Sequence, residues 1–208
     1  MKKITFFLLF SFLLFSCVPA AQTSSPTVTV YATSAAEPWL HKLFTCANDI
    51  SVVLNINADS PEIYLRLGEP EMIVSPVYQI GEEEILVVTQ PKNAVQNLTL
   101  AEAQILFAQG DPFVQVWVYA SDADVQLAFE QLVMKERRVT SSANAAVSPQ
   151  EMFNVLMSES NTLGILPRQW MTGNLREVYS AGTVPILAIT KSEPQGVLID
   201  LISCLQNN

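Results

Sequence analysis

Few polar residues of this chain stand where they could bind a small solute. Arg66 alternates with Leu65 and Leu67 along an expected strand, so its guanidinium would point away from the apolar face and toward a cleft. The alternative for Arg66 is an ion pair with a neighbouring glutamate at a sheet edge. Ser141 and Ser142 precede an expected helix, where their hydroxyls could bind a ligand or be ordinary loop serines. These residue types suit hydrogen bonding to a solute rather than catalysis.

The single histidine gives little support to metal or hydrolytic chemistry. His41 lies in an expected helix without a Cys or His at ligand spacing, so we expect no metal site. No nucleophile elbow accompanies it, which disfavours a Ser-His-Asp hydrolase. We therefore expect a protein that is not an enzyme and has no cofactor. Trp39 and Trp117 are expected in the core, whereas Trp170 could either stack on a solute or pack against protein.

The N-terminus has the pattern of a lipoprotein signal peptide. Two lysines precede the apolar run Ile4–Phe15, which is too short to span a bilayer as a helix. The run ends in Leu14–Cys17, which resembles a bacterial lipobox, so we expect Cys17 to carry acyl chains such as palmitate. We expect residues 1–16 to be the signal peptide and 17–26 a flexible tether. The protein would then lie on the extracytoplasmic face of the cell membrane, and an uncleaved N-terminal anchor is the alternative.

The charge of the mature chain limits its partners. Without the two lysines of the signal peptide, 9 basic residues face 20 acidic ones, which gives a net charge of −11. Nucleic-acid binding needs a basic face that displaces counterions, so we expect no nucleic-acid partner. The same charge disfavours electrostatic docking on anionic lipids. Contact with the membrane is therefore expected through the lipid anchor only.

Two cysteines remain once Cys17 is assigned to the lipid anchor. Cys46 and Cys204 each lie near the end of an expected helix, in a compartment where disulfides persist. A disulfide between them is one expectation, and two buried thiols are the other.

The mature chain alternates short apolar runs with helical patterns, which predicts an α/β fold. Three helix starts have the spacing of a capping box, at Thr99, Ser148 and Ser192. Glu82–Glu84 are expected in a solvated turn. The expected strands are Thr27–Tyr31, Ser51–Ile56, Glu62–Leu67, Ile85–Thr89, Val114–Ala120, Leu163–Leu166 and Pro185–Ile189. The expected helices are Glu37–Ala47, Leu100–Gln109, Asp124–Lys135, Pro149–Ser158 and Glu193–Gln206.

The order of these elements indicates two lobes. A βαβ unit opens the mature chain, a middle block has its own strands and helices, and a strand with a helix closes the chain. We expect residues 27–88 with 180–208 to form lobe 1 and residues 89–179 to form lobe 2. The chain would cross between the lobes near Ile85–Lys92 and Leu175–Val184.

Several phrases, in consistent order, resemble the phosphate-type solute-binding proteins of ABC transporters. Asn97–Gly110 (NLTLAEAQILFAQG) resembles the family segment NLTLEQLRDIFSG. The other similar phrases are Ala128–Glu130, Val139–Ser142, Ser148–Met152, Leu163–Arg168, Val184–Ala188 and Ser192–Pro194. The resemblance implies a two-lobed type II periplasmic binding protein fold. It also implies a non-enzymatic receptor that closes on a small-molecule solute and delivers it to an ABC permease.

The loops that the resemblance assigns to the ligand differ from those of a phosphate receptor. The first loop keeps two hydroxyls, Thr33 and Ser34, but Glu37 falls at or beside the helix start, as a cap or as a capping-box partner. The second loop places Asp124 where the family has hydroxyls, glycine and a cation, with Ser121 and Asp122 beside it. A like-charge contact at 4 Å costs about 4 kcal/mol at an effective dielectric constant of about 20. We therefore expect carboxylates at both helix starts and a ligand other than inorganic phosphate.

Two functions are compatible with these features. The first is an extracytoplasmic solute-binding lipoprotein with a ligand other than phosphate. The second is a binding-protein fold that has lost its solute and acts as an interaction or sensor module of the cell envelope. The candidate ligand-binding residues are Thr33, Ser34, Arg66, Ser121, Asp122, Ser141 and Ser142.

Overall fold

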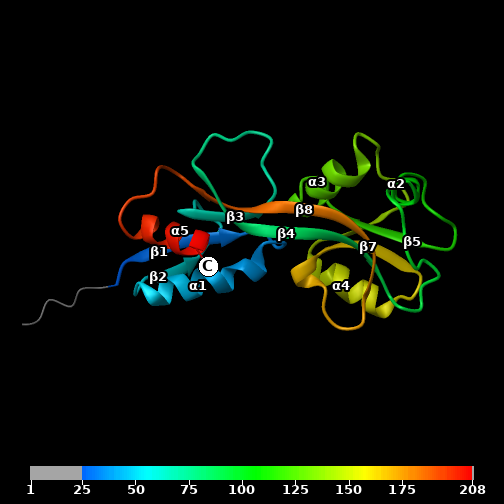
Figure 1. The fold of residues 1–208 in the computed structure, drawn as a ribbon, viewed down its shortest axis with the longest axis horizontal. Helices are drawn as coiled ribbons and strands as arrows, with labels where there is room; N and C mark the ends of the chain where they lie inside the picture. Colours follow the sequence, from blue (N-terminus) through cyan, green and yellow to red (C-terminus); the bar gives the residue numbers. More distant parts are fainter. Residues whose placement is uncertain (1–24, 208) are drawn as a thin grey trace, which may run out of the picture.

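The computed structural model describes residues 25–207, which form an α/β protein built on one mixed sheet of eight strands. The strand order is β2-β1-β3-β8-β4-β7-β5-β6. Figure 1 shows two lobes joined along the middle of this sheet. The expected signal peptide (1–16) and the lipidation site Cys17 lie outside the described residues.

Lobe 1 consists of the parallel strands β1, β2 and β3 with helices on one face. Alternation of buried and exposed positions along β1 and β3 places Val28, Val30, Ile63 and Leu65 in the core. The opposite face of the same strands is only half-buried. The elements are β1 (Thr27–Ala32), the short 3-10 helix η1 (Glu37–Trp39), α1 (Leu40–Asp49), β2 (Val53–Ile56), β3 (Ile63–Leu67) and α5 (Val197–Asn207).

Two long antiparallel strands pass through both lobes. β4 (Val77–Thr89) and β8 (Arg176–Thr190) pair from Val77↔Ile189 to Thr89↔Arg176 (Figure 1). In lobe 1 β8 also pairs with β3, and in lobe 2 β4 also pairs with β7. The expected crossings at 85–92 and 175–184 overlap these strands, and the exact lobe boundaries stay a prediction.

Lobe 2 contains the middle part of the chain. Its strands β5 and β7 are parallel. β7 is buried along its whole length, as is typical of strands covered on both faces, whereas Gln115 and Trp117 of β5 are half-buried. The elements are α2 (Leu100–Gln109), β5 (Gln115–Tyr119), α3 (Asp124–Phe129), the π-helical turn η2 (Glu130–Met134), β6 (Asn144–Ala146), α4 (Pro149–Ser158), β7 (Thr162–Pro167) and the 3-10 helix η3 (Arg168–Trp170).

Capping explains where two of the helices begin. Thr99 and Glu102 form a reciprocal capping box, and α2 begins at the next residue after Thr99. Ser148 accepts a hydrogen bond from the Glu151 amide, and α4 begins after it. The third expected capping box, at Ser192, is wrong. Gly196 turns with a φ of 55°, and α5 begins only after it.

The expectation of a turn at Glu82–Glu84 is wrong as well. These residues lie inside β4, which begins at Val77 rather than at Ile85. Glu83 is buried because its carboxylate finds hydrogen-bond donors inside the protein. The sequence pattern gave no sign of these partners, because both are distant along the chain.

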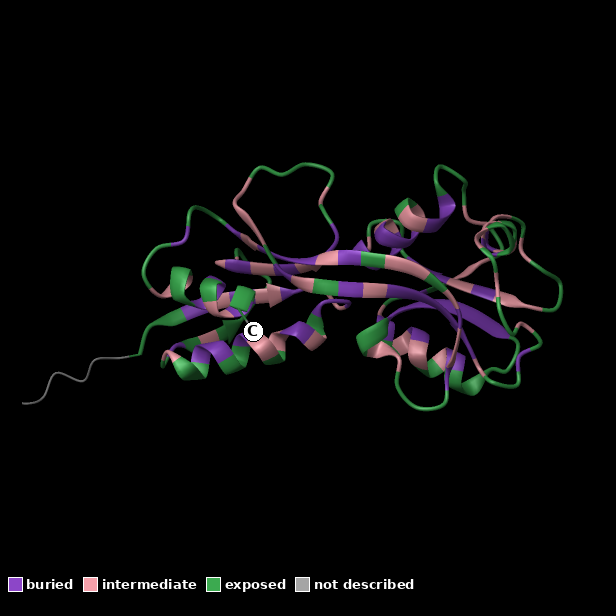
Figure 2. Cartoon of the chain, viewed as in Figure 1, coloured by how far each residue is buried: buried purple, intermediate pink, exposed green. Residues whose placement is uncertain are grey.

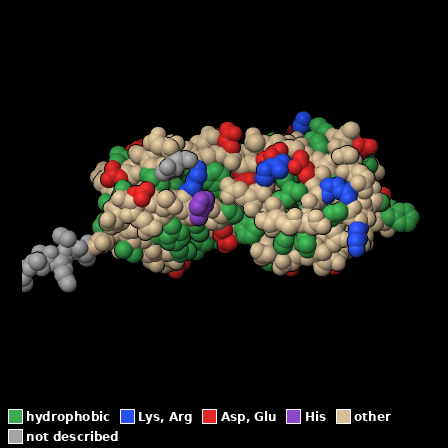
Figure 3. Space-filling view, turned by 60° about the horizontal axis from the view of Figure 1, so that its bottom comes forward, with side chains coloured by type: hydrophobic (Ala, Val, Ile, Leu, Met, Phe, Trp, Pro, Cys, Tyr) green, Lys and Arg blue, Asp and Glu red, His purple; other side chains and the backbone are tan. Residues whose placement is uncertain are grey.

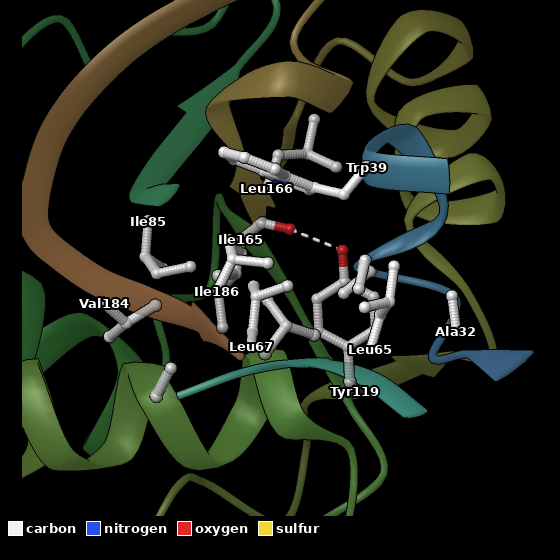
Figure 4. Close-up of a cluster of buried hydrophobic side chains, with 14 of the residues drawn as sticks. Ala32, Trp39, Leu65, Leu67, Ile85, Tyr119, Ile165, Leu166, Val184 and Ile186 are labelled. Carbon is white, nitrogen blue, oxygen red and sulfur yellow. Dashed lines mark hydrogen bonds between the residues drawn. The ribbon is translucent and has the colours of Figure 1, made fainter. Parts of the chain in front are cut away.

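The apolar core runs without interruption through both lobes (Figure 2). At the junction, Leu65 and Leu67 of β3 lie close to Tyr119 of β5 (Figure 4). The hydroxyl of Tyr119 donates to the Ile165 carbonyl at 2.7 Å, and burial raises the pKa of this phenol well above its usual value. The two lobes are therefore packed against each other and not merely tethered.

The expected disulfide is confirmed. Cys46 of α1 and Cys204 of α5 are bonded, with 5.8 Å between their Cα atoms. The bridge joins the two helices of lobe 1 and connects the start of the domain to its end.

Candidate ligand site between the lobes

The first expected ligand loop follows β1 and makes a tight turn into η1. The amide of Thr33 donates to the Leu65 carbonyl at 3.0 Å, which fixes the loop on the end of β3. The amide of Ala36 donates to the Thr33 carbonyl at 3.0 Å and contacts its Oγ1 at 3.3 Å. The Thr33 hydroxyl is consequently aimed toward lobe 2, with its own proton free to be donated.

Asp124 of lobe 2 accepts the hydrogen bond from this hydroxyl. Its Oδ2 accepts the Thr33 hydroxyl at 2.6 Å and the Leu67 amide at 2.8 Å, so both donors come from lobe 1. Its Oδ1 accepts the adjacent Val125 amide at 2.9 Å. Asp124 is buried, with 6% of its surface exposed. We call this group, Thr33, the Leu67 amide and Asp124, the interlobe site.

The interlobe site has the chemistry of an anion site whose anion belongs to the chain. A hydroxyl and an amide converge on one oxygen, as they would on an oxygen of a bound oxyanion. Because the oxygen is that of Asp124, an external anion would have to displace this buried carboxylate and would be repelled by its negative charge. The arrangement therefore disfavours anions between the lobes.

A second group of contacts joins the same loop to lobe 2. The indole Nε1 of Trp170 donates to the Ala35 carbonyl at 3.1 Å. The carboxylate of Glu83 accepts the indole of Trp39 at 3.1 Å and the amide of Gln169 at 3.2 Å. Burial raises the pKa of Glu83, although these hydrogen bonds oppose the rise. Trp170 thus serves the contact between the lobes, and its indole N–H is already used.

Gly81 explains how Trp39 fits at this junction. A Cβ added at Gly81 would lie 2.2 Å from the Trp39 ring, so the indole packs directly on the backbone of β4. The position accepts no side chain unless the ring moves.

Arg168 adds a charged contact at the edge of the junction. Its guanidinium bonds Glu84 at 2.5 Å and Glu177 at 2.7 Å, so η3 is joined to β4 and β8. These hydrogen bonds hold the pKa of Glu84 below its usual value and raise that of Arg168. Because the pair is substantially exposed, it contributes little to stability by itself.

The structure brings only one of the expected ligand-binding residues into the interlobe site. Thr33 is there, and Ser34 is half-buried beside it in the loop. Ser121 and Asp122 are exposed, and the cap of α3 is Ala123, so Asp122 does not cap that helix.

The remaining expected residues lie elsewhere. Ser141 is exposed, and Ser142 lines a hollow of about 290 Å³ beside Gly110 in lobe 2. Arg66 lies on the half-buried face of β3, and its Nε donates to the Leu67 carbonyl at 3.3 Å. An ion pair of Arg66, the alternative from the sequence, is not formed with any residue in the range 25–207.

Both helix starts hold a carboxylate, as expected, since Glu37 is the first residue of η1 and Asp124 the first of α3, but the expected capping role of Glu37 is wrong. Asp124 enters the interlobe site, but Glu37 is exposed and makes no capping bond, because η1 is capped by Ala36 without a side-chain contact. Sequence reasoning missed the Leu67 amide and Glu83. Glu83 stands between Glu82 and Glu84 in the sequence, so no local signal distinguished it from its two neighbours.

Other chemistries find no support in the described part of the chain. Residues 25–207 contain no cluster of three His, Cys, Asp or Glu side chains that could hold a metal ion. No helix in this range is long and apolar enough to cross a membrane. On the face seen in Figure 3, Lys and Arg side chains are scattered rather than gathered into a basic patch.

Comparison with solved structures defines the class of fold as type II periplasmic binding protein. A putative phosphate ABC transporter substrate-binding protein from Clostridium perfringens, solved with bound phosphate, matches with a TM-score of 0.76 and 14% identity. The match covers 86% of this chain and 92% of that one. An ABC-type phosphate transport receptor from Vibrio cholerae matches with a TM-score of 0.64 and 12% identity, over 87% and 93% of the two chains.

Regulatory domains of transcription factors share the same fold. The reduced regulatory domain of OxyR2 from Vibrio vulnificus matches with a TM-score of 0.69 and 9% identity, over 88% of this chain and 95% of that domain. No protein-family model and no curated protein sequence matches this chain. The similar structures are binding proteins and regulatory domains, and at these identities they establish the fold alone.

Proposed function

We propose that this chain is an extracytoplasmic recognition module that holds its own lobes together through Asp124 and does not bind inorganic phosphate. In this proposal the module acts by contact with another component of the cell envelope. It needs no solute to reach its closed form, because the chain supplies the group that a solute would supply.

The contact of Asp124 with Thr33 and the Leu67 amide carries this proposal. In a binding protein that closes on a solute, donors from the two lobes meet on the ligand. Here the donors of lobe 1 meet on a side chain of lobe 2, and the Trp170–Ala35 bond closes the same loop a second time. Both contacts favour a form in which the lobes are closed without a ligand.

The anchor is part of the proposal. The lipobox-like Leu14–Cys17 and the Cys46–Cys204 disulfide are both compatible with an exported protein on the outer face of the cell membrane. An ABC permease is one partner that would contact a closed binding protein, and a sensor protein is another.

A second candidate function is a solute receptor with a ligand other than phosphate. A hollow on the open face of the lobe 1 sheet favours it, because this hollow is lined by Lys191, which forms no ion pair within residues 25–207, and by two stacked tyrosine rings. That hollow is distinct from the interlobe site.

Small-angle X-ray scattering tests the proposal on a soluble form that begins at residue 18. We expect the radius of gyration of the solute-free protein to match the closed structure and to stay unchanged when phosphate is added. Asp124→Ala should increase it, because the two bonds from lobe 1 are lost. A wild-type protein that is expanded alone and compacts with phosphate would instead be an ordinary phosphate receptor.

A further inference from the structure

The open face of the lobe 1 sheet contains two adjoining hollows, and Asp124 lines neither of them. The larger, of about 430 Å³, is lined by Tyr31, Tyr64 and Lys191 among others. The smaller, of about 190 Å³, lies between Tyr64, Arg66 and the loop of residues 68–76. Tyr64, Ser75 and Ile189 line both hollows, which therefore adjoin, and we call the two together the lobe 1 pocket. Its size is that of pockets that hold small organic ligands.

The wall of the lobe 1 pocket is aromatic. Tyr31 of β1 and Tyr64 of β3 are paired in register, and their rings stack with centroids 5.8 Å apart and planes 5° from parallel. Both side chains lie on the half-buried sheet face, opposite the face that α1 and α5 cover. Stacked rings with a wet hydroxyl end suit a flat ligand ring better than a flexible chain.

The charges of the lobe 1 pocket are opposite to those of the whole protein. The chain has 20 acidic and 11 basic residues, yet within the described range both hollows are lined by cations and by no acidic side chain. Arg66 and Lys191 form no ion pair with any residue in that range. The guanidinium of Arg66 uses its Nε on the Leu67 carbonyl, which leaves its two terminal nitrogens for a carboxylate.

The loop of residues 68–76 gives the pocket an exposed apolar rim. Its ends are fixed on β8, by the Gly68 amide on the Pro185 carbonyl at 2.8 Å and by the Thr190 amide on the Pro76 carbonyl at 3.1 Å. Between these ends Met72 and Val74 are 78% and 84% exposed, which is unusual for large apolar side chains in a folded loop. Folding of this loop onto a bound ring would bury them.

We propose that the lobe 1 pocket binds a ring-bearing carboxylate. Arg66 binds the carboxylate, the Tyr31–Tyr64 pair stacks against the ring, and Lys191 adds positive charge at the far end. Met72 and Val74 close over the ring from the loop. An aromatic acid and a sugar acid share this chemistry, so the test must separate them. The proposal does not depend on the interlobe site.

Isothermal titration calorimetry on the full chain in detergent micelles tests the pocket with four probes. Benzoate and glucuronate are the two ring-bearing carboxylates, and benzamide and glucose are their uncharged counterparts. We expect one of the acids to bind, with its uncharged counterpart at least about tenfold weaker, because hydrogen bonds to charged groups contribute more than neutral ones. The acid that binds identifies the ligand as aromatic or saccharide. Absence of binding by both acids at millimolar concentration would overturn the proposal.

Matched variants assign the binding to the pocket. Arg66→Gln should lower the affinity for the acid by about tenfold or more, because the charged hydrogen bonds to the carboxylate are lost. It should not lower the melting temperature, because Arg66 is only half-buried. Arg138→Gln, which removes an exposed arginine of lobe 2, is the control and should leave the affinity unchanged. Met72→Ser should lower the affinity for the acid and for its uncharged counterpart by the same factor. Equal affinity of Arg66→Gln and wild type would overturn the proposal, and phosphate binding between the lobes would leave it unaffected.

Discussion

At the scale of single residues, Asp124 connects parts of the chain that are far apart. It bonds Thr33 at a sequence separation of 91 and Leu67 at one of 57, and it brings no donor of its own. Removal of its carboxylate leaves the buried Leu67 amide unpaired. An unpaired buried polar group costs about 1–3 kcal/mol.

We therefore expect Asp124→Ala to lower the free energy of unfolding by about 2–4 kcal/mol. Asp122→Ala is the matched control, because Asp122 is exposed two residues away, and its effect should stay within about 0.5 kcal/mol. Urea denaturation of the two variants measures both values. Equal stability of the two variants would show that the interlobe bonds contribute nothing.

Glu83 makes the stability depend on pH in a defined direction. Burial raises the pKa of Glu83 in the folded protein above its value of 4.5 in the unfolded chain. A raised folded pKa gives stability that is fully present below the unfolded pKa and is lost as pH rises through the folded pKa. Glu83→Gln removes this loss while it keeps an acceptor for Trp39.

The stability of Glu83→Gln relative to wild type should consequently rise between about pH 4 and pH 7. Glu82→Gln, an exposed neighbour on the same strand, is the control. Chemical denaturation at several pH values gives the difference for each variant. A difference for Glu83→Gln that is flat across this range would contradict burial as the cause of the shift.

At the scale of elements, the disulfide joins α1 to α5 and closes most of the domain into one loop. Cys46 and Cys204 are 158 residues apart in sequence. In the chain-entropy model, a bridge over so long a loop stabilises the fold by about 3–5 kcal/mol.

We expect the double variant Cys46→Ser with Cys204→Ser to lose about that amount of unfolding free energy, with the same sheet still formed. A reducing agent should destabilise the wild type by a similar amount and leave the variant unchanged. Guanidinium unfolding with and without the reductant measures both effects. A wild type that is indifferent to reductant would show that the bridge is not formed in solution.

Elements with local signals were predictable, and those defined by distant contacts were not. The bounds of Leu100–Gln109 and Pro149–Ser158 agree with the structure, because Thr99 and Ser148 cap them from adjacent positions. β4 was predicted eight residues short, because the partners of Glu83 come from η1 and η3. β6 was missed, since three residues offer too little periodicity.

The candidate site shows the same division. The resemblance to phosphate-type binding proteins brought Thr33 and the start of α3 to the same cleft, and the structure has them in contact. Nothing local showed that Asp124 rather than Asp122 would face lobe 1, because its partners Thr33 and Leu67 are far away in the sequence. Ser142 was predicted as a ligand residue because it lies in a loop before a helix, but in the structure its side chain lies beside Gly110.

At the scale of the whole molecule, the proposed lipid anchor decides where the protein acts. Cys17→Ser removes the proposed acyl acceptor and should leave the chain unprocessed or released from the membrane. Metabolic labelling with a fatty acid and cell fractionation measure this. Cys46→Ser is a control that should keep the label, because Cys46 is in the disulfide. Fatty-acid label on the Cys17→Ser variant would show that another residue carries the lipid.

The proposed closure of the two lobes by Asp124 is tested most directly by the response to inorganic phosphate. A ligand at about a thousand times its dissociation constant adds about 4 kcal/mol to the unfolding free energy, so micromolar affinity cannot escape calorimetry at millimolar phosphate. We predict no heat of binding for wild type. We predict measurable binding for Asp124→Gly with Asp122→Ser, which frees the Thr33 hydroxyl and the Leu67 amide and removes two charges. Micromolar binding of phosphate by the wild-type protein would contradict the closure of this site by Asp124.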